Sequence, residues 1–367
     1  MLRSTISFLL GSSCIAGVLA HWQQGTLHRR TYFYVGQSYT PQGNSTIAAD
    51  QVYVERLSPA HVTQPLPILL IHGQGMTGTN FLNTPDGRLG WADYLLSQGY
   101  ELYIMDQPSR GRSPWQPTVD GALVVPFNTF AVESRFTASQ RFKLWPQAAL
   151  HTQWPGNGSV GDPVFDEFYA STAPSLNSTA EQARKIKNAG SQLLDQIGPV
   201  ILMTHSLAGQ FGWILADSRP KQVKAIVALE PWGPPLINAV FPPFTPARVW
   251  GLTDLPVAYD PPVKSPSDIA RVIASDSPGF TCSQQAKPAR KLINLVNIPV
   301  LVVTSEASYH AIYDNCSVEY LRAAGVSVEH TRLGDVGIHG NGHMFFMEKN
   351  NIQIAKHIKP WISKIRA

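Results

Sequence analysis

The sequence predicts an α/β fold with a mostly parallel β-sheet flanked by helices. Short apolar runs rich in Val, Ile and Leu recur along the chain without polar alternation, which is typical of strands buried on both faces. These runs alternate with helical patterns, and such an alternation indicates an α/β architecture. With 367 residues, of which 44% are hydrophobic, the chain is large enough for one substantial core.

The predicted elements follow one another in a regular order. The buried strands are expected at residues 66–71, 101–105, 199–203, 224–229, 299–303 and 326–331. Helices are expected at residues 91–98, 179–197, 207–216 and 317–324. The second helix is well marked, because Ser178 and Glu181 form a capping box at its start. Residues 31–57 alternate aromatic and β-branched side chains, which predicts an antiparallel edge of the sheet.

Two insertions, at about residues 115–176 and 231–287, interrupt this order. Both are rich in proline and show little periodicity, and loops of this length are unusual unless they are functional. We expect them to form a cap or pocket wall over the C-terminal edge of the sheet, and a merely decorated surface is the alternative. Trp145, Trp154, Phe165 and Trp232 are candidates for an apolar pocket wall, although such aromatics are equally expected in a core.

The first twenty residues have the pattern of a signal peptide. Arg3 supplies the positive charge, residues 6–19 are apolar, and Ala20 ends a small-residue cleavage site before His21. The mature domain would then span residues 21–367 and be secreted, and an uncleaved anchor is the alternative. The apolar run is too short to span a bilayer comfortably and no later stretch is longer, so stable membrane insertion is not expected.

Cysteines and sequons agree with an exported protein, and the charge bears on its partners. Cys14 leaves with the signal peptide, so Cys282 and Cys316 remain and are expected to form a disulfide, with two free buried thiols as the alternative. N-glycosylation sequons begin at Asn44, Asn157, Asn177 and Asn315. The net charge is only +4 and the sequence contains no Lys/Arg run, which argues against a nucleic-acid partner.

The central chemical candidate is Ser206. A strand at residues 199–204 leads into Ser206 and then into a helix, which is the setting of a nucleophile elbow. Thr204 and Ala208 stand where this motif usually has glycine, so an ordinary buried serine is the alternative. An earlier strand ends in His72-Gly73-Gln74-Gly75, where an oxyanion hole is expected. Its donors would be the backbone N–H groups of Leu207 and Gln74, with Gly75 as the alternative to Gln74. The turn at residues 106–113 is interpreted as structural.

A base and an acid must follow the nucleophile in the chain. His343 is the preferred base, because it lies directly before the last helical pattern, and His339 is the fallback. Glu230 and Glu306 each follow a predicted strand, so either could orient the imidazole.

Taken together, these residues resemble the α/β-hydrolase superfamily from about Pro65 to Trp361, and within it the secreted serine esterases typified by the bacterial esterase 713. The nucleophile, acid, base and oxyanion loop of that group match Ser206, Glu230, His343 and Gln74. The stretches at residues 144–156 and 161–170 also resemble that group. One departure is that Gln74-Gly75 replaces a pair of adjacent cysteines in the oxyanion loop. In many members of the superfamily the acid instead follows the later strand, at a position that aligns with Ser308.

The function expected from these residues is hydrolysis of a small-molecule carboxylic ester or lactone through an acyl-enzyme, without a cofactor. A zinc hydrolase is disfavoured, because Gly340 and Gly342 break the helix that His339 and His343 would need as ligands. A hydrolase with a carboxylate nucleophile is disfavoured by Ser206 itself. A non-catalytic binding protein on the same fold remains the main alternative. The sequence indicates no oligomeric state.

Overall fold

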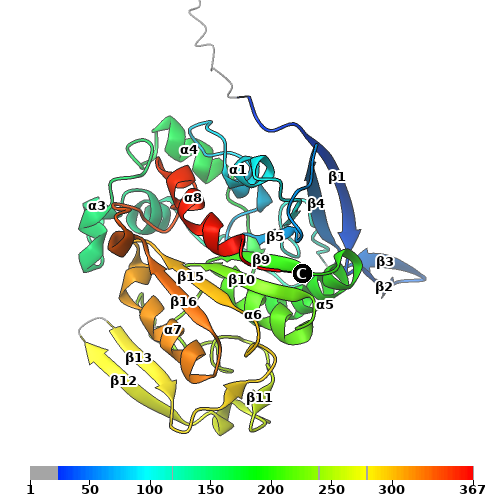
Figure 1. The fold of residues 1–367 in the computed structure, drawn as a ribbon. Coiled ribbons are helices and arrows are strands. Elements are labelled where there is room, and N and C mark those ends of the chain that lie inside the picture. The colour runs from blue at the N-terminus through cyan, green and yellow to red at the C-terminus, as the bar shows by residue number, and fades with distance from the viewer. Residues whose placement is uncertain (1–23, 118, 239, 278–279, 367) are drawn as a thin grey trace, which may run out of the picture.

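The computed structural model describes residues 24–366 apart from 118, 239, 278 and 279. An eight-stranded sheet forms its centre, in the order β1-β4-β6-β5-β9-β10-β15-β16 (Figure 1). Its strands are β1 (His28–Val35), β4 (Val52–Pro59), β5 (Ile68–Ile71), β6 (Leu102–Met105), β9 (Val200–His205), β10 (Val223–Leu229), β15 (Val300–Thr304) and β16 (Val328–Arg332). From β6 to β16 all neighbouring strands are parallel, whereas β4 runs antiparallel to both β1 and β6. The predicted fold class and its antiparallel edge are therefore confirmed.

Helices cover both faces of this sheet because its strands are apolar on both faces. Along β5, Leu69 and Ile71 join a core with α5 (Thr179–Ile197), α6 (Ala208–Ser218) and α7 (Asp314–Ala323). Ile68 and Leu70 point the other way, into a core with α1 (Trp91–Ser97) and α8 (Asn351–Ile362). This is the two-residue alternation of a strand, with both sets buried.

Each insertion contains short regular elements that the sequence pattern did not predict. The first holds β7 (Leu123–Val124), α2 (Thr129–Val132), a π-helical turn (Glu133–Thr137), α3 (Ser139–Phe142), a 3-10 turn (Pro146–Leu150), α4 (Pro163–Ala170) and β8 (Ser175–Leu176). The second holds β11 (Tyr259–Asp260), a 3-10 turn (Pro266–Asp268) and the hairpin of β12 (Arg271–Ser277) and β13 (Phe280–Gln285). Outside the insertions lie the hairpin of β2 (Ser38–Gln42) and β3 (Ser45–Ala49), β14 (Lys291–Leu292), and 3-10 turns at Gly78–Phe81, Tyr309–Ile312 and Leu333–Val336.

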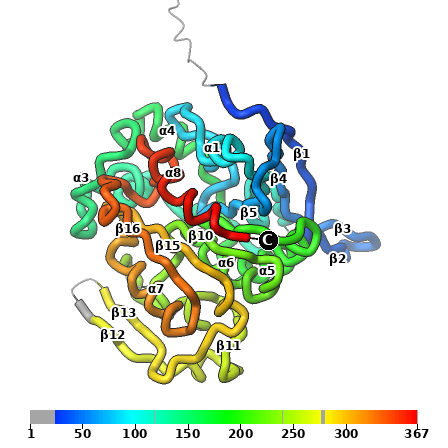
Figure 2. Tube along the Cα trace, in the orientation of Figure 1, coloured from blue at the N-terminus to red at the C-terminus, as the bar shows by residue number. Residues whose placement is uncertain are grey.

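The structure joins Cys282 to Cys316 in a disulfide. This bond connects β13 to α7, and Figure 2 shows the β12–β13 hairpin beside that helix. It ties the second insertion to the α/β core.

The described residues also bear on export and membrane insertion. The sequon asparagines at 44, 157, 177 and 315 are all exposed, as glycosylation requires. The predicted signal peptide lies outside the described residues. Within the described part of the chain, no helix is both long and apolar enough to cross a bilayer.

Candidate active site

Ser206 occupies a sharp turn between β9 and α6. Its backbone φ of 55° lies in the left-handed region, which a side-chain-bearing residue adopts only where the surrounding structure holds it. The backbone N–H of Ser206 donates to the carbonyl of Leu229 at 3.0 Å, and the N–H of Trp232 donates to the carbonyl of Ser206 at 2.8 Å. These bonds attach the turn to the end of β10. The strand–turn–helix geometry is that of a nucleophile elbow.

Glycines near the turn explain how it accommodates Thr204. A Cβ at Gly212 in α6 would lie 3.2 Å from Thr204 Cγ2, so this glycine gives the threonine methyl its space. Gly209 allows a similar close approach, because a Cβ added there would lie only 2.5 Å from the Cβ of Pro231. A Cβ added at Gly73 would likewise lie 3.1 Å from the Cβ of Ser206. Glycines at positions 73, 209 and 212 therefore provide the space that this motif usually gains from glycines at positions 204 and 208.

Glu230, directly after β10, is completely buried and accepts several hydrogen bonds. Its Oε1 accepts from the N–H of Ser305 at 2.8 Å and from the hydroxyl of the same serine. Its Oε2 accepts from Ser308 Oγ at 2.7 Å. Burial raises the pKa of the Glu230 carboxyl to about 7, while the charge of nearby His310 and the Ser305 hydrogen bonds oppose that rise.

His343 pairs with this carboxylate. Its Nδ1 lies 2.5 Å from Glu230 Oε2, and because a carboxylate only accepts, Nδ1 carries the proton. The ring is 2% exposed, and burial, followed by the nearby His310, lowers the pKa of His343 well below its usual value. The neutral tautomer therefore leaves Nε2 as an acceptor, and among the described residues Nε2 has no hydrogen-bond partner.

The ring of His343 lies beside the elbow. Its centroid is 4.5 Å from that of His205, the residue before Ser206. It also packs on Tyr309 at 5.0 Å, and Tyr309 and Ser206 line the same cavity. Burial raises the pKa of Tyr309, so its hydroxyl stays protonated. Among the described residues no hydrogen bond joins Ser206 to His343, which is common for catalytic pairs without substrate.

The alternative base and acid pair with each other elsewhere. His339 Nδ1 lies 2.9 Å from Glu306 Oε1, and the His339 side chain is 63% exposed. The second oxygen of Glu306 accepts from the N–H of Gly340 at 2.9 Å. The structure thus brings Glu230 and His343 together beside Ser206, and keeps His339 and Glu306 outside that group.

Two backbone donors beside Ser206 are free. Gln74, Ser206 and Leu207 line the same cavity. In the described part of the chain, the N–H groups of Gln74 and Leu207 have no hydrogen-bond partner, whereas the N–H of Gly75 donates to Ser175 Oγ at 3.4 Å. This difference favours Gln74 over Gly75 as an oxyanion donor.

The turn after β6 holds the loop that carries Gln74 in place. Arg110 is buried and donates to the carbonyl of Gly73 at 3.0 Å and to Gln182 Oε1 at 3.0 Å. Burial lowers its pKa to about 9. The N–H of Gln107 donates to His72 Nε2 at 3.0 Å. The structural role expected for this turn is therefore specific: it fixes the loop that carries Gln74.

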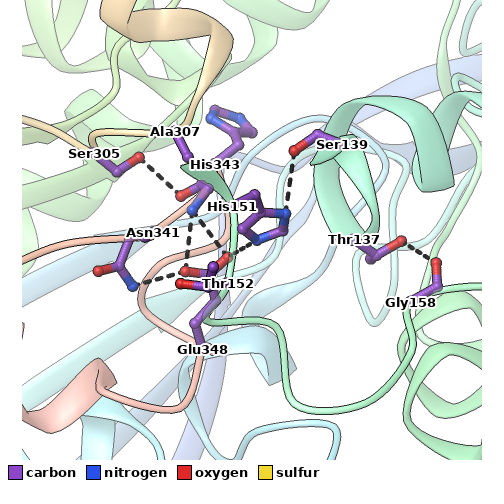
Figure 3. A network of polar contacts seen from close by, with 12 residues as sticks. Thr137, Ser139, His151, Thr152, Gly158, Ser305, Ala307, Asn341, His343 and Glu348 are labelled. Atoms are coloured by element: carbon purple, nitrogen blue, oxygen red, sulfur yellow. Dashed lines mark hydrogen bonds and ion pairs between the residues drawn. The ribbon is translucent and has the colours of Figure 1, made fainter. Parts of the chain in front are cut away.

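A second buried carboxylate, Glu348, fixes the loop that carries His343 (Figure 3). It accepts from His151 Nε2 at 2.7 Å, from Asn341 Nδ2 at 2.7 Å and from the N–H of Gly342 at 3.0 Å. Ser139 Oγ lies 3.1 Å from the other nitrogen of His151. A Cβ at Gly342 would lie only 2.9 Å from His151 Nε2, so glycine here permits close approach to this network.

One group of side chains has the composition of a metal site. The ligand atoms of Glu230, His310 and His343 lie within 4.8 Å of one another. However, His310 uses Nδ1 for Asp314 at 2.9 Å and Nε2 for Tyr313 at 2.8 Å, and His343 uses Nδ1 for Glu230. Both nitrogens of His310 and Nδ1 of His343 therefore already have hydrogen-bond partners, which leaves His343 Nε2 as the one imidazole nitrogen of this group without a partner among the described residues. The zinc pair considered from sequence does not converge either, because His339 and His343 bind different carboxylates.

Both insertions contribute to the cavity at Ser206, which has a volume of about 240 Å³. Phe127, Arg135 and Phe136 come from the first insertion, and the second provides residues between Trp232 and Pro243. Of the four aromatics considered from sequence, Trp232 lines this cavity, whereas Trp154 and Phe165 lie in the core. Trp145 is buried and donates from Nε1 to the carbonyl of Ala307 at 3.0 Å.

The chain belongs to the alpha/beta hydrolase family, whose model matches residues 68–356. It is 48% identical over 337 residues to a protein named "Probable secreted lipase phiG" from Fungal sp. (strain ATCC 74256). The match covers 91% of this chain and 89% of that protein. The resemblance to the α/β-hydrolase superfamily is thereby confirmed.

A solved bacterial esterase, described as novel, has the same fold. It superimposes with a TM-score of 0.63 at 23% sequence identity, covering 94% of this chain and 98% of the esterase. At this identity the likeness concerns the fold.

Proposed function

We propose that this protein is a secreted serine hydrolase that cleaves a carboxylic ester or lactone with Ser206, His343 and Glu230. The buried hydrogen bond between His343 and Glu230, beside the strained Ser206 turn, carries the proposal. The relative named as a probable secreted lipase supports an ester substrate. No step requires a cofactor.

In the proposed reaction, Ser206 Oγ turns towards His343 Nε2 and attacks the acyl carbon. His343 takes the serine proton, and Glu230 stabilises the resulting imidazolium. The N–H groups of Gln74 and Leu207 bind the oxyanion. The C–O bond to the alcohol then breaks, His343 protonates the leaving oxygen, and water releases the acyl group by the same steps in reverse. In a lactone the leaving oxygen stays attached to the acyl part.

Export is part of the same proposal. The signal-peptide pattern at residues 1–20, the disulfide between Cys282 and Cys316, and the exposed sequon asparagines all suit an oxidising, glycosylating route. Mass spectrometry of the protein secreted by its host would test cleavage before His21 and show which sequons carry glycans.

Ser206→Ala is the direct test. It should abolish hydrolysis of a panel of esters and lactones and prevent labelling by a fluorophosphonate, while the thermal unfolding temperature stays unchanged. Ser97→Ala, which changes an exposed serine on α1, is the matched control and should keep full activity. Activity of Ser206→Ala within tenfold of the parent would refute the proposal. A folded parent that neither reacts with the probe nor cleaves any ester would favour a non-catalytic binding protein.

A further inference from the structure

Arg135 is the one charged side chain among the described residues that line the cavity at Ser206. The other lining residues are apolar, aromatic or neutral polar ones, such as Phe127, Trp232 and Asn238. A cationic group in such a wall affects which substrates bind, because a guanidinium that loses water without gaining a partner is unfavourable.

The guanidinium of Arg135 has no anionic partner in the part of the chain that the structure describes. Among the described residues, no carboxylate lies within 4.0 Å of it and no hydrogen bond leaves it. It stacks instead over the ring of Phe241, with Cζ 4.2 Å from the centroid. By contrast, Arg112 binds both Asp106 and Glu55. The five N–H donors of Arg135 are therefore available to a ligand.

Arg135 is close to the reacting groups. It belongs to the π-helical turn Glu133–Thr137. The residue after Arg135 in this turn, Phe136, stacks on His343 with the ring centroids 5.4 Å apart. Phe241, under the guanidinium, packs against Tyr309 at 5.2 Å, and Tyr309 and Ser206 line the same cavity as Arg135. A molecule that reaches Ser206 therefore lies in the same cavity as this charge.

We propose that Arg135 binds a carboxylate on the substrate, so that the enzyme prefers esters that carry a free carboxylate beside the ester it cleaves. The planar guanidinium matches a carboxylate with two parallel hydrogen bonds. A neutral lipid ester in this cavity would leave the charge without a partner. This inference rests on the proposed ester hydrolysis and specifies its substrate class.

Matched ester pairs test this preference. Mono(4-nitrophenyl) adipate and its methyl ester differ in one carboxylate on the acyl side. 4-Acetoxybenzoate and its methyl ester differ in the same way on the alcohol side. For at least one pair, the parent enzyme should show a kcat/KM about tenfold higher for the acid, as expected for a hydrogen bond between charged groups. Rising salt should reduce the preference.

Variants assign the preference to Arg135. Arg135→Gln should remove the preference by lowering kcat/KM about tenfold more for the acid than for its methyl ester, and Arg135→Lys should keep part of the preference as a point charge. Arg141→Gln removes an exposed charge that binds Ser159 Oγ, and should keep the preference unchanged.

The outcomes separate the two proposals. Ser206-dependent hydrolysis without preference for the acid in either pair would overturn the carboxylate site alone. An equal loss for both members of a pair in Arg135→Gln would also overturn it. If no ester of either pair is cleaved in a Ser206-dependent way, the proposed function fails, and the carboxylate preference fails with it.

Discussion

Glu230→Gln should almost eliminate catalysis while preserving the shape of the site. Glu230 Oε1 accepts from the backbone N–H of Ser305, a donor that cannot reverse its role. The amide oxygen of glutamine should therefore occupy that position, which places its NH2 group towards His343 Nδ1. Nδ1 must then accept, so the imidazole proton moves to Nε2. His343 can no longer take the proton of Ser206.

The expected loss combines two effects. Removing the charge takes away a hydrogen bond to the imidazolium, which contributes about 1.5–3 kcal/mol, or roughly ten- to 150-fold in rate. Fixing the wrong tautomer costs more: the corresponding acid-to-amide change in a Ser-His-Asp protease lowers kcat about 10⁴-fold. We therefore expect kcat of Glu230→Gln to fall by about 10³- to 10⁴-fold, with KM changed little.

The assay is steady-state hydrolysis of 4-nitrophenyl butyrate, with thermal unfolding as the check on folding. Glu306→Gln is the matched control. It changes a carboxylate that binds the exposed His339 and the N–H of Gly340, so it should keep activity within about threefold. If Glu306→Gln is crippling and Glu230→Gln is mild, the acid is assigned to the wrong residue.

Other predictions follow from the same contacts. Because the pKa of Glu230 is raised to about 7 and its ionised form is needed, kcat/KM should be full above that pH and fall as pH drops below it; a profile flat down to pH 5 would contradict this. Replacing Cys282 and Cys316 by serine should lower the free energy of unfolding by about 3–4 kcal/mol, because the disulfide closes a loop over a separation of 34 residues and so reduces the entropy of the unfolded chain. A change below about 1 kcal/mol in urea unfolding would show that loop closure contributes little. Glu348→Gln should lower kcat about ten- to hundredfold with KM nearly constant, because it loosens the His343 loop. Glu348→Asp should recover part of that loss, and equal changes in kcat and KM would indicate a general structural defect.

The sheet could be predicted because burial on both faces leaves a local signal. Strands such as Ile68–Ile71 and Val300–Thr304 are almost wholly aliphatic, so each is recognisable alone. The β12–β13 hairpin could not be predicted in this way. Residues 271–275 of β12 are exposed, so this strand does not need a continuous apolar run. The attachment of the hairpin to α7 depends on a disulfide partner far along the chain.

The candidate residues of the site were identified to different degrees. Ser206 and His343 stand out through local sequence and chain order. Glu230 and Glu306 both follow strands, and among the sequence observations the resemblance to the secreted esterases selects Glu230. The fold then brings Glu230 to His343, 113 residues away. Glu348 and Arg135 gave no signal, because their roles depend on groups brought near by the fold. The contact between Glu348 and His151, for example, joins residues 197 positions apart.

The proposed acid at Glu230 also accounts for the serine at position 308. Ser308 aligns with the acid of many superfamily members, and here its hydroxyl donates at 2.7 Å to Glu230 Oε2, the same oxygen that binds His343. An aspartate at 308 would bring a second carboxylate against Glu230, and two like charges this close in a buried site cannot both ionise. One of them would hold a proton and weaken the anion that His343 requires. An acid at 230 therefore calls for an uncharged donor at 308, so these two positions of the site depend on each other.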